Sequence, residues 1–558
     1  MREPEDPSAF WKTWQAGADL WVQGFQYWID ATQRWLLTAE TLRRRANQML
    51  DHYAQGMPPL LCFPYEVILD GRTLERPVSY ALLRIVPPDG WTPRPGRPPV
   101  VVIDPRAGHG PGIGGFKEDS EVGISIEEGH HTYFVSFFPH PCQGQTLQDV
   151  ERTEARFMEV VHHRHADLPR PVVYGNCQAG WATAMLGADR PDVTGPMVIN
   201  GAPMSYWAGA PGVNPMRLGG GLSGGAWGAL LLADLNAGEL DGAWLVQNFE
   251  SLNPARTWFR KEYDLFDQVD TERDRFLRFE KWWTGFYFLG EREIEMIVSD
   301  LFIGNKLEKG ALELGPGHRI DLRNIRDPLV VFASGGDDIT PPHQALHWIW
   351  EVYGSTEELR KHEQRIVYLL NTHVGHLGIF VSARVAQREH RAMIESLDRI
   401  AALPPGLYEM KIVGETGETD PRADQFRVEF EERDVEQVRF PFPTEEFVTA
   451  RAISEWSSET YKTFVRPWIR MAVNPAVASW MRWFHPQRFL RLAWSDRFNP
   501  AMAALEPLAR LAEQHRRAAS DTNVFRQAER ATADAIEHSI ESWSSMRDQM
   551  NETLFRLL

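Results

Sequence analysis

Six short apolar runs, each bounded by turn-forming residues, most restrict what this chain can fold into. They lie at residues 99–104, 132–138, 172–175, 197–200, 329–333 and 366–370. Helical patterns separate several of them, as at 147–165 and 179–188. Short apolar strands that alternate with helices are typical of βαβ units. The sequence therefore predicts an α/β fold with a doubly wound, mostly parallel sheet.

The remaining segments flank this core or interrupt it. A Gly- and Trp-rich insertion is expected to cap the carboxyl ends of the strands, where such sheets bind ligands. A hairpin at 65–69 and 80–86 is predicted ahead of the first parallel strand. The predicted regions are an N-terminal amphipathic helical region at 1–57, the α/β domain at 58–403 with its cap insertion at about 202–291, a charged β-rich segment at 404–443, and a C-terminal helical region at 444–558.

Charge and cysteine content restrict the partners and the compartment. The net charge of −17 has the wrong sign for gripping phosphate backbones, so nucleic acid is not an expected partner. The sequence contains no uncharged apolar window long enough for a membrane-spanning helix, and the acidic N-terminus does not resemble a signal peptide. Three cysteines are too few for a disulfide framework. We therefore expect a cytoplasmic protein.

The most informative segment is a strand that runs directly into a helix with a cysteine at the turn. It reads Val-Val-Tyr-Gly-Asn-Cys-Gln-Ala-Gly-Trp over residues 172–181. Such a nucleophile elbow leaves little room, so Gly175, Ala179 and Gly180 are suitably small neighbours. The helix N-terminus favours a thiolate at Cys177, and the amide of Gln178 would face an oxyanion. A buried cysteine at an ordinary strand–helix turn is the alternative.

An acid and a base follow in the order that an elbow nucleophile needs. Asp337 and Asp338 lie at the Gly-rich end of one predicted strand, and His373 and His376 follow the next. The histidine would take the thiol proton, and the carboxylate would orient the ring. The pattern predicts a catalytic triad with Cys177, although spacing alone leaves both the aspartate and the histidine open.

Other motifs are weaker. The loop after the strand at 99–104 is the expected source of a second oxyanion amide, near His109 or Gly110. Residues 219–225 indicate a flexible Gly-rich loop, and the basic run at 162–165 lacks metal-ligand spacing, so no metal site is expected. Cys142 lacks an elbow and is expected to be a loop thiol.

At these residues the chain resembles the polyhydroxyalkanoate (PHA) synthase family, through a related bacterial branch. The family's lipase-like box, Gly-x-Cys-x-Gly-Gly, corresponds to residues 175–180, with Ala179 as one departure. Its acid motif, Asp-His-Ile-x-Pro, falls on 337–341, and its Gly-His motif falls on 375–376. Further similar stretches lie at 120–139, 301–310 and 320–328. The resemblance covers roughly 95–400 and selects Asp337 and His376.

The resemblance implies an α/β-hydrolase-like fold and acyl transfer from a 3-hydroxyacyl-CoA thioester. Cys177 would form the acyl-enzyme and release CoA, so CoA enters as part of the substrate and no cofactor is expected. His376 would activate Cys177 and then the hydroxyl of the next unit or of a polyester chain end, assisted by Asp337. Trp282 and Trp283 of the insertion would bind substrate beneath a water-excluding cap.

Two departures leave alternatives open. Ala179 adds a methyl group at the crowded elbow, and Asp338 puts a second carboxylate where the family has a histidine. Like charges would raise the pKa of one carboxyl group and alter the base. The alternatives are an intracellular PHA depolymerase or thioesterase, hydrolytic or thiolytic, with the same triad, and a non-catalytic granule-associated protein.

The chain also carries 21 tryptophans, an excess that the triad does not explain. Trp14, Trp21, Trp28 and Trp35 recur every seven residues, which predicts a helix with an aromatic seam. The C-terminal region is also rich in tryptophan, at Trp456, Trp468, Trp480, Trp483, Trp494 and Trp543. These faces either pack within the chain or bind a partner, namely a second copy, a helical subunit or the surface of a PHA granule.

Overall fold

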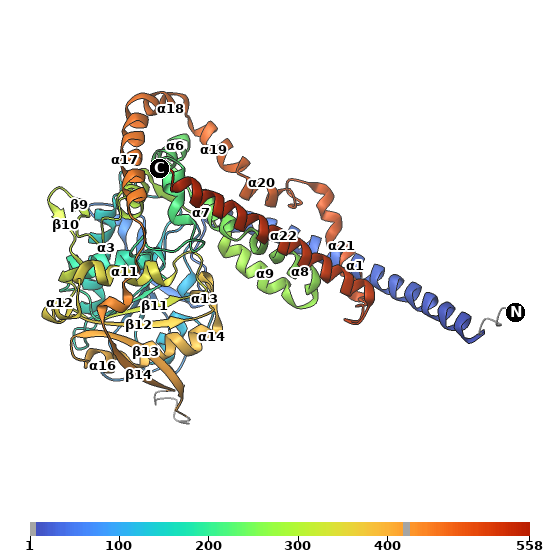
Figure 1. Ribbon diagram of the computed structural model, residues 1–558, viewed down its shortest axis with the longest axis horizontal. Coiled ribbons are helices and arrows are strands. Elements are labelled where there is room, and N and C mark those ends of the chain that lie inside the picture. The colour runs from blue at the N-terminus through green and yellow to red at the C-terminus, as the bar shows by residue number, and fades with distance from the viewer. Residues whose placement is uncertain (1–6, 417–424) are drawn as a thin grey trace. The chain divides into compact units, whose positions relative to one another are not determined.

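The computed structural model describes residues 7–416 and 425–558, with side chains from Trp14 onward, Ala16 excepted. These residues form two compact units (Figure 1). The sheet unit comprises Gly56–Val246, Gly285–Arg482 and Asp548–Leu558, and the helical unit comprises Met1–Gln55, Gln247–Thr284 and Trp483–Arg547. Both units therefore combine segments that are far apart in the sequence.

A ten-stranded sheet organises the sheet unit. Its order is β1-β2-β4-β3-β5-β6-β11-β12-β13-β14. The strands are β1 (Tyr65–Asp70), β2 (Tyr80–Ile85), β3 (Val100–Ile103), β4 (Thr132–Phe137), β5 (Val172–Asn176), β6 (Met197–Asn200), β11 (Leu329–Ser334), β12 (Arg365–Asn371), β13 (Gly406–Glu415) and β14 (Phe426–Arg433). Neighbours from β4 to β13 pair in parallel, whereas β1, β2 and β14 pair antiparallel. This arrangement confirms the predicted fold class.

Helices on the sheet explain the continuous apolar strands. Every residue of β3, β5, β6 and β11 is buried, as in parallel sheets covered on both faces. The helices of this unit are α2 (Glu121–Glu127), α3 (Leu147–Arg164), α4 (Gln178–Asp189), α5 (Met216–Leu222), α6 (Trp227–Leu235), α10 (Glu291–Met296), α11 (Pro342–Tyr353), α12 (Thr356–Lys361), α13 (His376–Val381), α14 (Ala383–Val385), α15 (Arg391–Glu395), α16 (Leu397–Ala401), α17 (Glu445–Thr460) and α18 (Arg466–Ala472). Because β5, β6, β11 and β12 are parallel neighbours, their carboxyl ends meet at one edge, where ligands of such sheets bind.

The segment predicted as a separate β-rich region, 404–443, belongs to the main sheet. β13 pairs in parallel with β12, and β14 pairs antiparallel with β13. Leu407, Tyr408 and Met410 are buried, so pairing with β12 covers apolar side chains that an isolated hairpin would expose. The turn predicted between the two strands includes 417–424, which lie outside the described residues.

The insertion predicted as one cap, 202–291, is divided between the units. Its first part and its end belong to the sheet unit, where β7 (Glu239–Asp241) pairs antiparallel with β8 (Phe288–Gly290). Residues 247–284, which include α8 (Lys261–Asp267) and α9 (Val269–Trp283), belong to the helical unit. Their apolar side chains pack with helices from both ends of the chain, which the local sequence pattern does not reveal. A second small hairpin, β9 (Glu313–Gly315) with β10 (His318–Arg319), follows the insertion.

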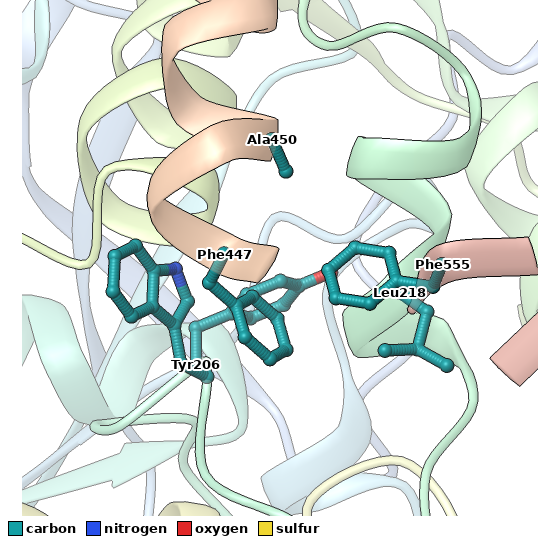
Figure 2. Close-up of a cluster of buried hydrophobic side chains, with 6 residues drawn as sticks. Tyr206, Leu218, Phe447, Ala450 and Phe555 are labelled. Carbon is teal, nitrogen blue, oxygen red and sulfur yellow. The ribbon is translucent and has the colours of Figure 1, made fainter. Parts of the chain in front are cut away.

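Residues near the C-terminus complete a second apolar core in the sheet unit. Figure 2 shows Tyr206 and Leu218 of the insertion facing Phe447 and Ala450 of α17 and Phe555 near the C-terminus. The rings of Phe447 and Phe555 lie 4.8 Å apart between centroids. The predicted C-terminal helical region, 444–558, is therefore shared between the two units.

The helical unit has its own core and a buried ion cluster. Its helices include α1 (Pro7–Ala54), α8, α9, α20 (Pro486–Leu492) and α21 (Leu505–Gln514), while α7 (Gly242–Leu252), α19 (Pro475–Phe484) and α22 (Val524–Phe555) run through both units. Glu280 is fully buried and contacts Lys261 at 2.7 Å and both Arg45 and Arg491 at 3.4 Å. Burial opposes ionisation of Glu280, but these three cations outweigh it and hold its pKa far below the usual range. Among the described helices, none is both long and apolar enough to cross a bilayer.

Candidate active site

Cys177 alone forms the turn between β5 and α4. Its backbone has φ 51° and ψ −118°, a combination that residues with a side chain seldom adopt. The Cys177 N–H donates to the Asn200 carbonyl at 2.8 Å, and the Gly180 N–H donates to the Cys177 carbonyl at 2.9 Å. These bonds hold the strained turn and place the thiol at the carboxyl edge of the sheet.

The two glycines of the elbow are required by close packing. A Cβ at Gly175 would meet the Ala179 carbonyl oxygen at 2.6 Å. A Cβ at Gly180 would meet Ile199 Cγ2 at 2.7 Å and would come still closer to the Ala202 Cβ. Helix α4 therefore crosses β5 and β6 at a distance that only glycine permits at these positions.

We expect Gly180→Ala to destabilise the protein by about 1–3 kcal/mol, because the added methyl group overlaps packed atoms of β6 and its loop. Gly228→Ala in α6 is the matched control, since a Cβ there has no neighbour within 4 Å. Alanine favours a helix over glycine, so the control should be unchanged or up to about 1 kcal/mol more stable. Urea unfolding of both variants measures the contrast, and equal stabilities would contradict the crowding argument.

The edge of the sheet brings Cys177, His376 and Asp337 together. His376 Nε2 lies 3.2 Å from Cys177 Sγ, and His376 Nδ1 lies 2.8 Å from Asp337 Oδ2. All three side chains are buried. The second oxygen of Asp337 accepts backbone N–H bonds from Ile339 at 2.9 Å and Thr340 at 2.7 Å, which fix the carboxylate in place.

The alternatives that spacing left open lie apart from this arrangement. Asp338 and His373 are both exposed, whereas Asp337 and His376 face each other across the loops after β11 and β12. Burial by itself lowers the pKa of His376, but the Asp337 carboxylate and the Cys177 sulfur outweigh it and raise that pKa well above 6.5. The site therefore favours the protonated, imidazolium form of His376.

The loop after β3 lies beside this arrangement. The buried Asp104 carboxylate accepts backbone N–H bonds from Gly112, from Ile113 at 2.8 Å and from Gly114 at 3.1 Å, which close the loop on itself. Burial lowers the pKa of His109 to about 4, and the nearby His376 contributes to this lowering. His109 is therefore neutral near pH 7.

The end of the insertion holds the predicted oxyanion residues of this loop in place. Phe286 forms a β-bridge with His109, and the Tyr287 N–H donates to the Gly108 carbonyl at 2.9 Å. A Cβ at Gly110 would overlap the Tyr287 ring at 2.6 Å, so the backbone of Gly110 packs directly on an aromatic face. The other predicted donor is the N–H of Gln178. It is the first N–H of α4, so no carbonyl group within the helix accepts it.

A buried polar network behind the elbow is a feature that sequence reasoning missed. Glu121 of α2 accepts bonds from the amide groups of Asn176 at 2.5 Å and Asn200 at 3.0 Å. The two asparagines are also bonded to each other at 3.0 Å. The signal in the sequence was an asparagine at the end of each of two adjacent strands. Asn176 directly precedes Cys177, and the backbone carbonyl of Asn200 accepts the Cys177 N–H. The network therefore supports the elbow from both strands.

Burial raises the pKa of Glu121 to about 8, against the lowering effect of the Asn176 and Asn200 amides. The folded protein therefore retains a proton that the unfolded chain loses near pH 4.5. The contribution of Glu121 to the free energy of unfolding is therefore complete below pH 4.5 and is lost as the pH rises to about 8. Over this range the free energy of unfolding falls by at most about 1.4 kcal/mol per pH unit. We expect Glu121→Gln to flatten the fall in unfolding free energy between the two pKa values of this group, 4.5 in the unfolded chain and about 8 in the folded protein. Glu357→Gln, at an exposed site in α12, should leave the wild-type slope unchanged, and parallel curves for all three proteins would contradict the assignment.

Trp282 and Trp283, the predicted substrate-binding residues, belong to the helical unit. Both are buried, at 0% and 5% exposed, and Trp283 Nε1 donates to Glu250 at 2.9 Å. Phe279 stacks on Trp283 with 5.8 Å between ring centroids. The structure therefore uses these tryptophans in the core of that unit, and it does not bring them into the unit that carries Cys177.

The other two cysteines lie in different environments from Cys177. Cys62 is exposed and Cys142 is half-buried. Burial raises the pKa of Cys62 to about 11 and also raises that of Cys142. Near neutral pH both groups are therefore thiolate to a smaller extent than an ordinary cysteine, which makes them weaker nucleophiles. They serve as matched controls for Cys177. Across residues 7–416 and 425–558, no three His, Cys, Asp or Glu side chains form a metal-binding group.

The strand order and the cysteine elbow with its His–Asp pair define the class: an α/β-hydrolase-like fold with a cysteine at the nucleophile position. The chain belongs to the DUF3141 family, described as a protein of unknown function, whose profile matches residues 30–558. It is 45% identical over 530 residues to a Rhizobium meliloti protein described as an uncharacterized protein in the ackA 5' region. That match covers 93% of this chain and 72% of the relative.

Solved structures resemble the chain only distantly. Naproxen esterase of Bacillus subtilis is 12% identical with a TM-score of 0.34, and the match covers 62% of this chain and 97% of the esterase. A monoacylglycerol lipase of Paleococcus ferrophilus is 13% identical with a TM-score of 0.33, covering 58% of this chain and 99% of the lipase. For a puromycin hydrolase the TM-score is 0.31 at 14% identity, and the match covers 61% of this chain and 40% of the hydrolase.

Proposed function

We propose that the protein is a cysteine-dependent acyltransferase of the PHA synthase type, which takes an acyl group from a 3-hydroxyacyl-CoA thioester. The observation that carries the proposal is the contact of 3.2 Å between Cys177 Sγ and His376 Nε2, with the ring held by Asp337. Nucleophile, base and orienting acid occupy the three positions that acyl transfer through a covalent intermediate needs.

In the first half-reaction, His376 takes the thiol proton and Cys177 Sγ attacks the thioester carbonyl carbon. The resulting oxyanion is placed to accept N–H bonds from Gln178 and from the His109–Gly110 loop. The C–S bond to CoA then breaks, and the CoA sulfur receives the proton from His376. One thioester replaces another, so the acyl-Cys177 intermediate keeps the reactivity needed for the next transfer.

In the second half-reaction, His376 takes a proton from an acceptor hydroxyl group, and the hydroxyl oxygen attacks the acyl carbon. The bond between that carbon and Cys177 Sγ breaks, and His376 returns the proton to the thiolate. The product is an ester. With the 3-hydroxyl group of another unit or of a chain end as acceptor, repetition gives a polyester.

The choice of a 3-hydroxyacyl-CoA is supported by the resemblance of residues 175–180, 337–341 and 375–376 to the PHA synthase motifs. A cytoplasmic location at the granule surface belongs to the same proposal. Low exposure of the two reacting side chains supports the proposal, since Cys177 and His376 are only 9% and 5% exposed. Exclusion of water favours transfer to a hydroxyl group over hydrolysis.

The test incubates purified protein with 3-hydroxybutyryl-CoA, follows released thiol, and analyses the products and the protein by mass spectrometry. The proposal expects thiol release, an acyl adduct on Cys177 and an insoluble polyester. Cys142→Ala and Cys62→Ala should behave like the wild type. The absence of any adduct on Cys177 would leave a non-catalytic role as the better account.

Hydrolysis or thiolysis of polyesters by the same triad is the second candidate. The departures at Ala179 and Asp338 bear on it only because they weaken the resemblance to the synthase motifs while the geometry of Cys177, His376 and Asp337 is kept. Release of the free acid alone, with no polymer, would replace the acyltransferase proposal by this one. Formation of the Cys177 adduct is common to both.

A further inference from the structure

The N-terminal half of α1 turns a row of aromatic side chains outward. Trp14, Trp21, Trp28 and Trp35 recur every seven residues and are 62%, 84%, 61% and 54% exposed, and Phe25 beside them is 63% exposed. A seven-residue repeat keeps these side chains on one slowly drifting stripe of the helix. The stripe is a continuous apolar surface, about 30 Å long at 1.5 Å per residue.

The opposite face of the same helix packs within its unit through polar groups. Asp30 and Arg34 are fully buried and bonded to each other at 2.8 Å, and Arg34 donates to both carboxylate oxygens of Glu529. The Tyr27 hydroxyl donates to Glu529 at 2.8 Å. A helix on the surface of a soluble protein normally buries its apolar face and exposes its polar one. The inverted pattern in α1 indicates that the aromatic stripe is a surface for a partner.

Beside the row of tryptophans, the stripe carries a parallel row of small residues. Gly17, Gly24 and Ala31 each follow a tryptophan of the row by three residues and repeat with the same spacing. A Cβ at Gly17 would have no neighbour within 4 Å. Here the surface has a hollow of about 510 Å³, lined by Gly17, Leu20, Trp21, Gly24, Phe25 and Phe525. Gly24 already packs against Phe525 of the same unit, whose ring would lie 3.3 Å from a Cβ at that position, so the open part of the hollow is at Gly17. Large and small side chains at a common seven-residue spacing are suited to packing against a second helix of the same spacing, which a second copy of this chain supplies.

The charge of the stripe and of the chain distinguishes a second copy of the chain from an anionic surface as the partner. Between Trp14 and Trp35 the charged residues are Asp19 and the buried pair Asp30 and Arg34. At 100° per residue, Asp19 lies about 140° around the helix from Trp14 and therefore off the stripe. The stripe has no charge to repel a copy of itself, and a chain with a net charge of −17 does not favour an anionic surface.

We propose that α1 is a dimerisation helix, which pairs along this stripe with α1 of a second copy of the chain. The five exposed aromatic side chains offer on the order of 700 Å² on each helix, or about 1,400 Å² for the pair. This is the area of a standard stable interface, and a twofold axis lets the same stripe serve both partners. The inference concerns assembly and does not depend on the proposed catalytic activity.

The test measures the mass of the full-length protein by size-exclusion chromatography with light scattering. The wild type should have about twice the chain mass of 63.9 kDa, and Trp21→Glu/Trp28→Glu should have the mass of one chain. Gln15→Glu/Gln26→Glu is the matched control, since both glutamines are exposed on the same helix, about 100–120° from Trp14. It adds the same charge off the stripe and should remain a dimer.

A second variant, Gly17→Leu, fills the hollow and also raises the helix propensity at this position of α1. Gly17→Leu should raise the dimer dissociation constant at least about tenfold through steric overlap, while circular dichroism shows helix content preserved or increased. A wild type that is monomeric at all concentrations, or a tryptophan double variant that stays dimeric, would overturn the proposal. So would a monomeric wild type that binds phosphatidylcholine vesicles through Trp21 and Trp28, since the stripe would then be a lipid-binding surface.

Discussion

Replacing Cys177 with alanine is expected to lower acyl transfer from a 3-hydroxyacyl-CoA by at least about 10³-fold and to abolish the acyl adduct. Sγ is the atom that would bond to the acyl carbon, and the alanine side chain has no nucleophile in its place. Cys177→Ser should retain a small fraction of the activity, because a hydroxyl group at the same distance from His376 is a weaker nucleophile. Initial rates of thiol release measure the loss.

Two matched variants separate this effect from a general sensitivity to thiol loss. Cys142→Ala removes a half-buried thiol and Cys62→Ala an exposed one, and both should keep activity within about twofold of the wild type. Thermal unfolding of Cys177→Ala should show a folded protein. A folded Cys177→Ala variant with wild-type activity would refute the covalent scheme as a whole.

Asp337→Asn is expected to lower the same rate by about 10³–10⁴-fold near pH 7. An asparagine amide donates where the carboxylate accepts, so it favours the His376 tautomer that carries its proton on Nε2. That tautomer cannot take the Cys177 proton. Removal of the carboxylate also removes the charge that raises the pKa of His376.

The pH dependence gives this prediction a second readout. Hydroxide can remove the thiol proton without the imidazole, so the deficit of Asp337→Asn should shrink as the pH rises. Asp338→Asn is the control, because its side chain is exposed and next to Asp337 in the sequence. It should stay within about twofold of the wild type. The reverse result, with Asp338 essential and Asp337 dispensable, would reassign the orienting acid.

Local patterns predicted the sheet and the elbow, because both depend on residues close together in the chain. Continuous apolar runs between turn residues marked the buried strands, and Gly175 with Gly180 marked the two positions around the Cys177 turn that have no room for a side chain. The hairpin of β1 and β2 and the run into α4 follow the same logic. Each reflects sterics or hydrogen bonding between residues at most about 20 positions apart, as in the pairing of Tyr65 with Ile85.

Other features lay beyond local patterns because they depend on partners distant in the sequence. The segment 404–443 became two strands of the main sheet because β12 offers an edge for β13 to pair with. Trp282 and Trp283 looked like part of a cap, yet their helix packs in the helical unit, where Val269 shares a core with Leu37 of α1 and with Ala509 and Ala512 of α21. Glu121 had no signal of its own, since its bonds to Asn176 and Asn200 span 55 and 79 residues.

By itself the sequence determined the α/β class and placed Cys177 at a strand–helix turn, with aspartate and histidine candidates after two later strands, because strand patterns and turn sterics depend on residues close together in the chain. Spacing could not choose between Asp337 and Asp338, or between His373 and His376. The resemblance to the PHA synthase motifs selected Asp337 and His376, and only the tertiary structure gives the physical reason. The parallel order of β5, β11 and β12 brings their loops to one edge, where only Asp337 and His376 among these candidates are buried and hydrogen-bonded in line with Cys177.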